Sequence, residues 1–297
     1  MANIDIESAG EFIPEVWGTL VQHPLRKNTV MMGLTDRRWE KFLSDSGDRA
    51  FVPSYTEISA SEESRSTNAG FDSRGAADAE WSESALTFTD ITASQSVIEV
   101  DKRAYSAVLI DDPVKIQQNI DVMQIMTAEM ARSIVEKIDT RILTTMSGVS
   151  GSGGALDKAL DEIDILNAKE TLDVAKVKDE ERYLVVSPEG YMDLLNIDRY
   201  TNALYEAAFK TLDSGKGRGF KGTIMDFDIY QSTNVVASGN GHLNYMFQKE
   251  AVAFVMQEGV QVTRREPHDQ FASAVRAVTY YGAKALRTAA GVQLSAR

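Results

Sequence analysis

Apolar residues recur every three or four positions between residues 113 and about 146, as expected for one face of a long helix. Two aspartates precede Pro113 and suit the cap and first turn of that helix. At ~1.5 Å per residue the helix would be roughly 50 Å long. The glycine-rich run at 148–154 ends it and is predicted to be a hinge. The stripe comprises Ile116, Ile120, Met123, Met126, Met130, Ile134, Ile138, Ile142 and Met146.

The segment before the helix, residues 49–110, reads as extended chain around a polar tip. Residues 86–91 and 96–100 alternate apolar and polar side chains with the period of half-buried strands. Residues 49–54 form an earlier extended stretch, and between it and these strands lies a long acidic segment, residues 57–83, rich in Ser, Ala and Gly. Long polar excursions between strands are uncommon in compact domains and are usually functional or disordered. We predict a projecting hairpin.

Residues 1–48 carry scattered apolar side chains that Pro14 and Pro24 interrupt. The segment has apolar residues to bury, but it contains no helix or strand pattern long enough to bury them by itself. We therefore expect an arm that packs on something else, such as another subunit.

Beyond the helix, residues 155–243 have an α/β pattern. We predict a helix over 161–175, a buried strand over 183–187, a helix that Ser187 caps and Pro188 begins, and a helix over 203–212. Residues 224–231 alternate as one edge-like strand, and residues 244–297 are mostly strand-like. The chain is thus predicted to be α+β, in five regions: 1–48, 49–110, 111–154, 155–243 and 244–297.

Composition narrows the classes of function. The 297 residues are 43% hydrophobic and carry a net charge of −13, without a cysteine. Disulfides and thiolate metal sites are therefore excluded. The acidity argues against tight nucleic-acid binding and suits the wall of a container for nucleic acid. No apolar run approaches the ~20 residues needed to span a bilayer, and the N-terminal residues lack a signal-peptide pattern. We expect synthesis in a cytoplasm.

Candidate chemistry is sparse, so we expect no catalytic residue, no cofactor and no metal. The three histidines, His23, His242 and His268, are far apart in the sequence and form no metal-binding motif. Ser187 lacks a nucleophile elbow. The basic glycine loop at 215–222 matches neither common phosphate-loop spacing, although an α/β enzyme using this loop stays an alternative. No acid sits alone on an apolar face, where burial would raise its pKa.

Charge is distributed unevenly along the chain, because residues 57–83 are acidic while the last strands are basic. Two solvated surfaces would explain this division, and the sharper hypothesis is that the acidic hairpin lies across a neighbour's basic strands. Our subunit-interface candidates come from the arm, the hairpin and those strands. They are Phe12, Trp17, Glu62, Glu63, Asp72, Glu80, Arg264, Arg276, Lys284 and Arg287.

The order of these regions resembles the major capsid proteins of tailed bacteriophages of the Hong Kong 97 type. Residues 12–17, FIPEVW, look like the opening of the family's arm, and residues 182–195, RYLVVSPEGYMDLL, look like its axial-domain strand and helix. Residues 245–253 with 260–264 resemble the return segment, and residues 280–287, YYGAKALR, the final strand. The resemblance names the five regions: arm, extended loop with the first peripheral-domain strands, spine helix and hinge, axial domain, and return to the peripheral domain.

The resemblance implies a structural protein that catalyses nothing. Subunits would form pentamers and hexamers that tile an icosahedral shell around double-stranded DNA in the virion. The arm begins almost at Met1, which implies a separate scaffolding protein. Further implied partners are a portal and a decoration protein. An encapsulin-like nanocompartment, with the same fold around protein cargo, is the alternative.

Overall fold

The computed structural model describes residues 27, 29–43, 47–55, 58, 60, 93–111, 122–197, 200, 219–265 and 272–297. The chain divides into two compact units, one formed by residues 49–98 and the other by residues 1–48 with 99–297. In the smaller unit, strand β1 (Arg49–Tyr55) pairs with strand β2 (Ala93–Glu99). Both strands were predicted. The strand predicted at 86–91 and the helix predicted at 203–212 lie outside the described residues.

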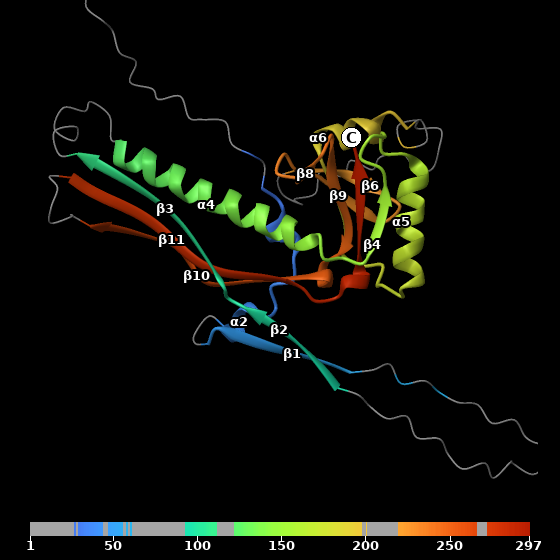
Figure 1. Ribbon diagram of the computed structural model, residues 1–297, viewed down its shortest axis with the longest axis horizontal. Coiled ribbons are helices and arrows are strands. Elements are labelled where there is room, and N and C mark those ends of the chain that lie inside the picture. Colours follow the sequence, from blue (N-terminus) through green and yellow to red (C-terminus); the bar gives the residue numbers. More distant parts are fainter. Residues whose placement is uncertain are drawn as a thin grey trace, which may run out of the picture. The chain divides into compact units, whose positions relative to one another are not determined.

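In the larger unit, a long helix lies along one face of a three-stranded antiparallel sheet (Figure 1). The helix is α4 (Val122–Met146), and the strands follow the order β10 (Val252–Arg265), β11 (Ala272–Ala285) and β3 (Lys102–Asp111). The predicted stripe is confirmed from Met130 onward, where its five members are buried, and Met126 is half-buried. The five buried members are Met130, Ile134, Ile138, Ile142 and Met146. The predicted start at Pro113 lies outside the described residues.

Seven strands form the second sheet, in the order β4, β12, β9, β5, β7 and β6, with β8 paired to β9. Two helices, α5 (Glu162–Val174) and α6 (Pro188–Leu195), contribute to the apolar cluster on one face. The strands are β4 (Gly151–Gly154), β5 (Arg182–Val186), β6 (Phe220–Ile224), β7 (Phe227–Gln231), β8 (Ala237–Ser238), β9 (Gly241–Gln248) and β12 (Gly291–Ala296).

Strand β5 is buried on both faces of this sheet, as its unbroken apolar run predicts. Leu184 and Val186 join the cluster beneath α5 and α6, while Tyr183 and Val185 join the cluster that includes α4. The helix start predicted after it is confirmed. The Ser187 hydroxyl accepts a hydrogen bond from the Gly190 amide at 3.0 Å.

Two predicted features differ in the structure. The glycine run at 148–154, predicted to be a hinge, contains strand β4, which pairs in parallel with β12. A Cβ on Gly154 would lie 2.2 Å from the Ser295 carbonyl oxygen, so close strand pairing requires glycine there. The strand predicted at 224–231 is a hairpin of β6 and β7, since Met225 and Asp226 both adopt positive φ. Strand β7 therefore lies inside the sheet, and β6 takes the edge.

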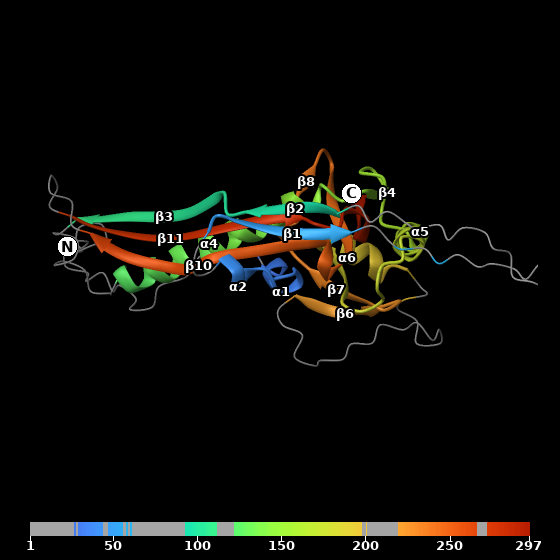
Figure 2. The same cartoon turned by 90° about the horizontal axis from the view of Figure 1, so that it is seen from below.

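Figure 2 shows β3, β11 and β10 side by side, and two continuous chain segments join this sheet to the seven-stranded sheet. Strand β9 runs through the short 3-10 helix η2 (Lys249–Ala251) into β10. Strand β11 returns through η3 (Thr288–Ala290) into β12. We call this crossing the elbow. Because both segments pass through the elbow, the pair β10–β11 of one sheet continues there into the pair β9–β12 of the other.

The arm is only partly described, and the described part packs on its own subunit. Val30 and the helix α1 (Met31–Leu34) contribute buried side chains to the α4 cluster. The helix α2 (Glu40–Leu43) follows and buries Leu43. For residues 30–34, the expected packing of the arm on something else is therefore packing on α4 of the same subunit.

A buried carboxylate joins this part of the arm to α4. Asp139 has no exposed surface, and its Oδ1 accepts hydrogen bonds from the backbone amides of Val30 at 3.0 Å and Met31 at 2.7 Å. Its Oδ2 accepts from the Asn234 side-chain amide at 3.1 Å. Burial raises the pKa of Asp139, and the three donors oppose that shift. Our expectation that no acid is buried in this way is wrong.

The Asn234 amide completes the junction from the seven-stranded side of the unit. Its oxygen accepts hydrogen bonds from the Thr140 hydroxyl at 2.9 Å and the Lys27 ammonium at 3.3 Å. Its nitrogen also donates to the Glu136 carbonyl at 3.2 Å. The arm, α4 and the loop after β7 therefore meet through side-chain hydrogen bonds.

We predict that Asp139→Ala lowers the free energy of unfolding by about 3 kcal/mol or more, because three buried donors lose their acceptor at about 1–3 kcal/mol each. Equilibrium denaturation of the unassembled protein measures this loss. Asp157→Ala removes an exposed aspartate and should change the value by less than about 0.5 kcal/mol. Equal effects of the two substitutions would contradict the claim that the Asp139 hydrogen bonds stabilise the fold.

Candidate subunit-interface surfaces

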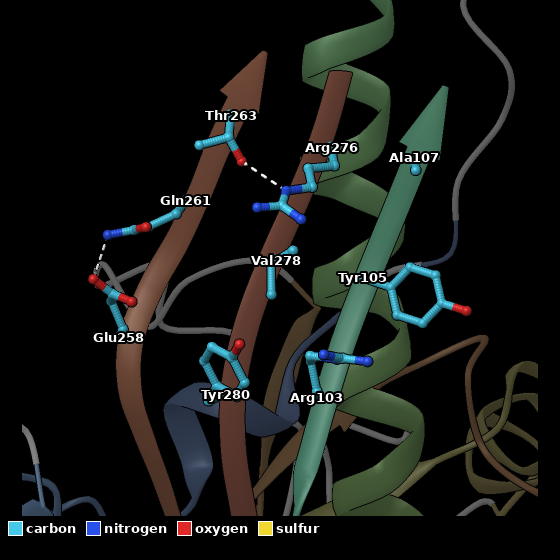
Figure 3. A pocket seen from close by; sticks show the side chains of 9 residues that line it. All are labelled: Arg103, Tyr105, Ala107, Glu258, Gln261, Thr263, Arg276, Val278 and Tyr280. Carbon is cyan, nitrogen blue, oxygen red and sulfur yellow. Dashed lines mark hydrogen bonds between the residues drawn. The ribbon is translucent and has the colours of Figure 1, made fainter. Parts of the chain in front are cut away.

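The three-stranded sheet has a face turned away from α4, which we call the open sheet face. Figure 3 shows its side chains, which come from all three strands. They line a shallow hollow of about 290 Å³. Its lining consists of Arg103, Tyr105, Ala107, Glu258, Gln261, Thr263, Arg276, Val278 and Tyr280.

Strand alternation creates this face. Successive side chains of a strand point to opposite sides, and the register places Tyr105 beside Val278 and Arg103 beside Tyr280. The side chains between them, such as Ala104 and Tyr281, point into the α4 core and are buried. The same alternation that fills the core thus puts aromatic and basic groups on the open sheet face.

The open sheet face combines exposed aromatic rings with positive charge. Tyr105 is 68% exposed and Tyr280 is 41% exposed. The Arg276 Nε donates to the Thr263 hydroxyl at 3.1 Å, and the Arg103 guanidinium lies 5.8 Å from the Tyr105 ring centre. Glu258 is the one acid among the described residues of the lining. Exposed aromatic groups beside arginine are typical of protein-binding surfaces, and this face fits an acidic partner.

The four predicted basic candidates separate in space. Arg276 and Lys284 lie eight positions apart on β11, an even offset that directs both side chains to the side of the open sheet face. Arg264 points to the other face, where its Nη2 donates to the Ser273 hydroxyl at 3.1 Å. Arg287 lies at the elbow, as described below. The candidates Phe12, Trp17, Glu62, Glu63, Asp72 and Glu80 lie outside the described residues.

Sequence reasoning missed Arg103, Tyr105 and Tyr280 as members of this face. The alternation of β3 between exposed Arg103 and Tyr105 and buried Ala104 gave a usable signal. Assigning the three residues to one surface also requires the pairing of β3 with β11, which are about 170 residues apart in the chain.

The elbow contains a carboxylate with three cationic partners. Glu250 binds the guanidinium groups of Arg38 at 3.3 Å and Arg287 at 2.9 Å. The ammonium of Lys178 approaches it at 3.3 Å. The Glu250 side chain is 13% exposed, whereas its partners are largely exposed. Arg287 therefore joins the end of β11 to the segments around residues 38 and 178.

The described residues offer little for catalysis. In that part of the chain no group of three or more His, Cys, Asp or Glu could hold a metal ion. His242 approaches Glu189 at 3.5 Å, while His23 and His268 lie outside the described residues. Burial raises the pKa of Tyr230 and of Tyr245 to about 12, so both phenols stay neutral at physiological pH. None of the described helices is long and apolar enough to cross a membrane.

The glycine loop at 215–222 is described only from residue 219. Strand β6 begins at Phe220, so the loop leads into a strand. Phosphate loops place their amides at a helix N-terminus, and this geometry does not provide one.

The family of this chain follows from its sequence. Residues 93–294 match the family model described as phage capsid protein. The chain belongs to this family. Curated proteins offer no match to the sequence of this capsid protein. The matched range includes the three-stranded sheet, α4 and the seven-stranded sheet down to Leu294.

Solved structures show that this capsid protein has the Hong Kong 97 fold. A chain from Mycobacterium phage Che8 aligns with a TM-score of 0.74 at 20% identity, over 95% of this chain and 97% of that one. A chain from the capsid of the cyanophage P-SCSP1u aligns with a TM-score of 0.72 at 16% identity, over 97% and 94%. A chain from the capsid of Ralstonia phage GP4 gives 0.65 at 13% identity, over 95% and 94%.

The fold class and the family are thus as the sequence predicts. The chain is an α+β phage capsid protein, which is a structural protein of the virion shell. A shell requires many copies of the chain to associate. The surfaces described above are therefore candidates for contacts between copies.

We predict that Glu250→Gln lowers the free energy of unfolding by about 1–2 kcal/mol at low salt, because three partly exposed ion pairs contribute up to about 1 kcal/mol each. Added salt should shrink the difference, because it screens the wild-type pairs. Thermal and chemical unfolding at two ionic strengths measure this. Glu258→Gln, at an exposed carboxylate of the open sheet face, is the matched control and should have little effect. A loss independent of salt would contradict the ionic explanation.

Proposed function

We propose that this capsid protein assembles as pentamers and hexamers into an icosahedral shell that encloses double-stranded DNA. The observation that carries the proposal is the phage capsid family match over residues 93–294. The open sheet face supports it, since an aromatic and basic surface of this kind gains stability when a partner covers it. A closed shell sums many such contacts, so that each can be weak.

The proposed contacts pair acidic with basic surfaces of neighbouring copies. Residues 57–83 contain seven acids, and Glu62, Glu63, Asp72 and Glu80 are our candidates for contact. Their proposed partners are Arg276 and Lys284 on a neighbour's open sheet face. Phe12 and Trp17 of the arm would bury their rings on another copy. Arg103 and Tyr280 join the proposed surface by their position beside Arg276.

Further partners follow from the same proposal. A separate scaffolding protein would set the curvature during assembly, and a portal would occupy one vertex. A decoration protein would bind the finished shell. The shell would enclose DNA without sequence-specific binding, and the net charge of −13 would keep most of its wall from adhering to the polymer.

Electron microscopy of the purified full-length protein, alone and with its neighbouring gene products, tests the proposal. We expect closed shells or five- and six-fold rings. The contents of the shells then distinguish the two alternatives. DNA inside would support a phage capsid, and protein inside would support a nanocompartment. A monodisperse monomer under every condition would contradict shell assembly.

The charge pairing has its own prediction. Arg276→Glu with Lys284→Glu should reduce shell yield at least about tenfold, because like charges would oppose residues 57–83 of the neighbour. The control variant, Lys158→Glu with Lys176→Glu, makes the same change in net charge at exposed sites before and after α5. This variant should assemble normally. Deletion of residues 57–83 should also block assembly. Normal shells from this deletion would rule out the pairing.

A further inference from the structure

A second basic surface lies on the other side of β3, in the groove between that strand and α4. The groove has a volume of about 600 Å³. Four of its lining residues are cations, Lys102 and Arg103 from β3 and Lys137 and Arg141 from α4. No acid lines it. We call it the spine groove.

Helix periodicity aligns the basic side of this groove. Ser133, Lys137, Arg141 and Thr144 are spaced four, four and three residues apart, which places them on one face of α4. The distance along the helix from the first to the last is roughly 16 Å, at ~1.5 Å per residue. The spine groove is therefore a row of donors and suits an extended ligand better than a compact ion.

Three of the four cations lack a carboxylate partner. Lys102 binds Asp101 at 2.7 Å, but within the described part of the chain no acid pairs with Arg103, Lys137 or Arg141. The Arg141 Nε is shielded from solvent and has no hydrogen-bond partner there. The Arg141 guanidinium is thus partly desolvated, and such a cation attracts an anion more strongly than one that is fully hydrated.

The lining favours a phosphate polymer over an acidic peptide. Peptides dock mainly through apolar or aromatic anchors in pockets. Here Ile134 and Tyr281 are buried in the core, and the exposed Tyr105 ring lies beside the Arg103 guanidinium. The groove thus offers cationic and hydroxyl donors from both β3 and α4, and phosphate backbones bind through such groups without reading sequence.

We propose that the spine groove binds the phosphate backbone of double-stranded DNA. The identity of the polymer rests on the proposed function, in which the shell encloses DNA. The acidic chain repels DNA over most of its surface, so the groove would hold the polymer weakly and locally. The interaction would be independent of sequence and sensitive to salt.

The test measures binding of a short fluorescent DNA duplex to the full-length, unassembled protein by anisotropy over a range of salt concentrations. We expect log K to fall linearly with log salt, and Lys137→Gln with Arg141→Gln to reduce that slope by about 2, close to one unit per lost phosphate contact. Lys158→Gln with Lys176→Gln removes the same charge elsewhere and should leave the slope unchanged. Circular dichroism checks that both variants fold.

If the double variant does not fold, Lys137→Gln alone, at an exposed side chain, should reduce the slope by about 1. Equal losses in the groove and control variants would overturn the proposal, because they would indicate a general charge effect. Failure of the wild-type protein to bind the duplex, or preference for polyglutamate over DNA, would also overturn it. Electron microscopy of the same samples reports shell assembly separately. Failure of shell assembly and failure of DNA binding in the groove therefore give different results.

Discussion

The apolar stripe of α4 is the constraint on which the larger unit depends. A helix of 25 residues with one buried face cannot hold that face in water alone, and the three-stranded sheet covers it. Covering the stripe along its length needs long strands, and β10 and β11 have 14 residues each. One helix covers only one face of a sheet. The open sheet face is therefore a direct consequence of how the core is built.

Continuity between the two sheets follows from the same strands. The α4 cluster includes Tyr183 and Phe247 of the seven-stranded sheet beside Phe254 and Tyr281 of the three-stranded sheet. One apolar core thus spans both sheets, with the elbow beside it. Glu250 and Asp139 add charged or buried polar contacts at the places where separate segments meet. Such contacts contribute modest free energy, and they specify which segments meet because an unpaired buried charge is costly.

Charge in this protein is segregated. The chain is acidic overall, yet β3 has basic side chains on the open sheet face and beside the spine groove. Arg103 lines both surfaces. The two proposals thus assign anionic partners of different chemistry to the two sides of the same strand.

The sequence by itself determined the elements whose signals are local. The α4 stripe, the Ser187 cap with Pro188, and the buried β5 follow from periodicity and from capping chemistry between near neighbours. The order of the elements was enough to indicate the capsid family. Only the tertiary structure decided the rest. The glycine run became a strand because β12 lies beside it, and Asp139 became buried because the arm and Asn234 supply its donors. Grouping Arg276 with Arg103, and separating both from Arg264 and Arg287, depends on strand register between distant segments, which no local pattern encodes.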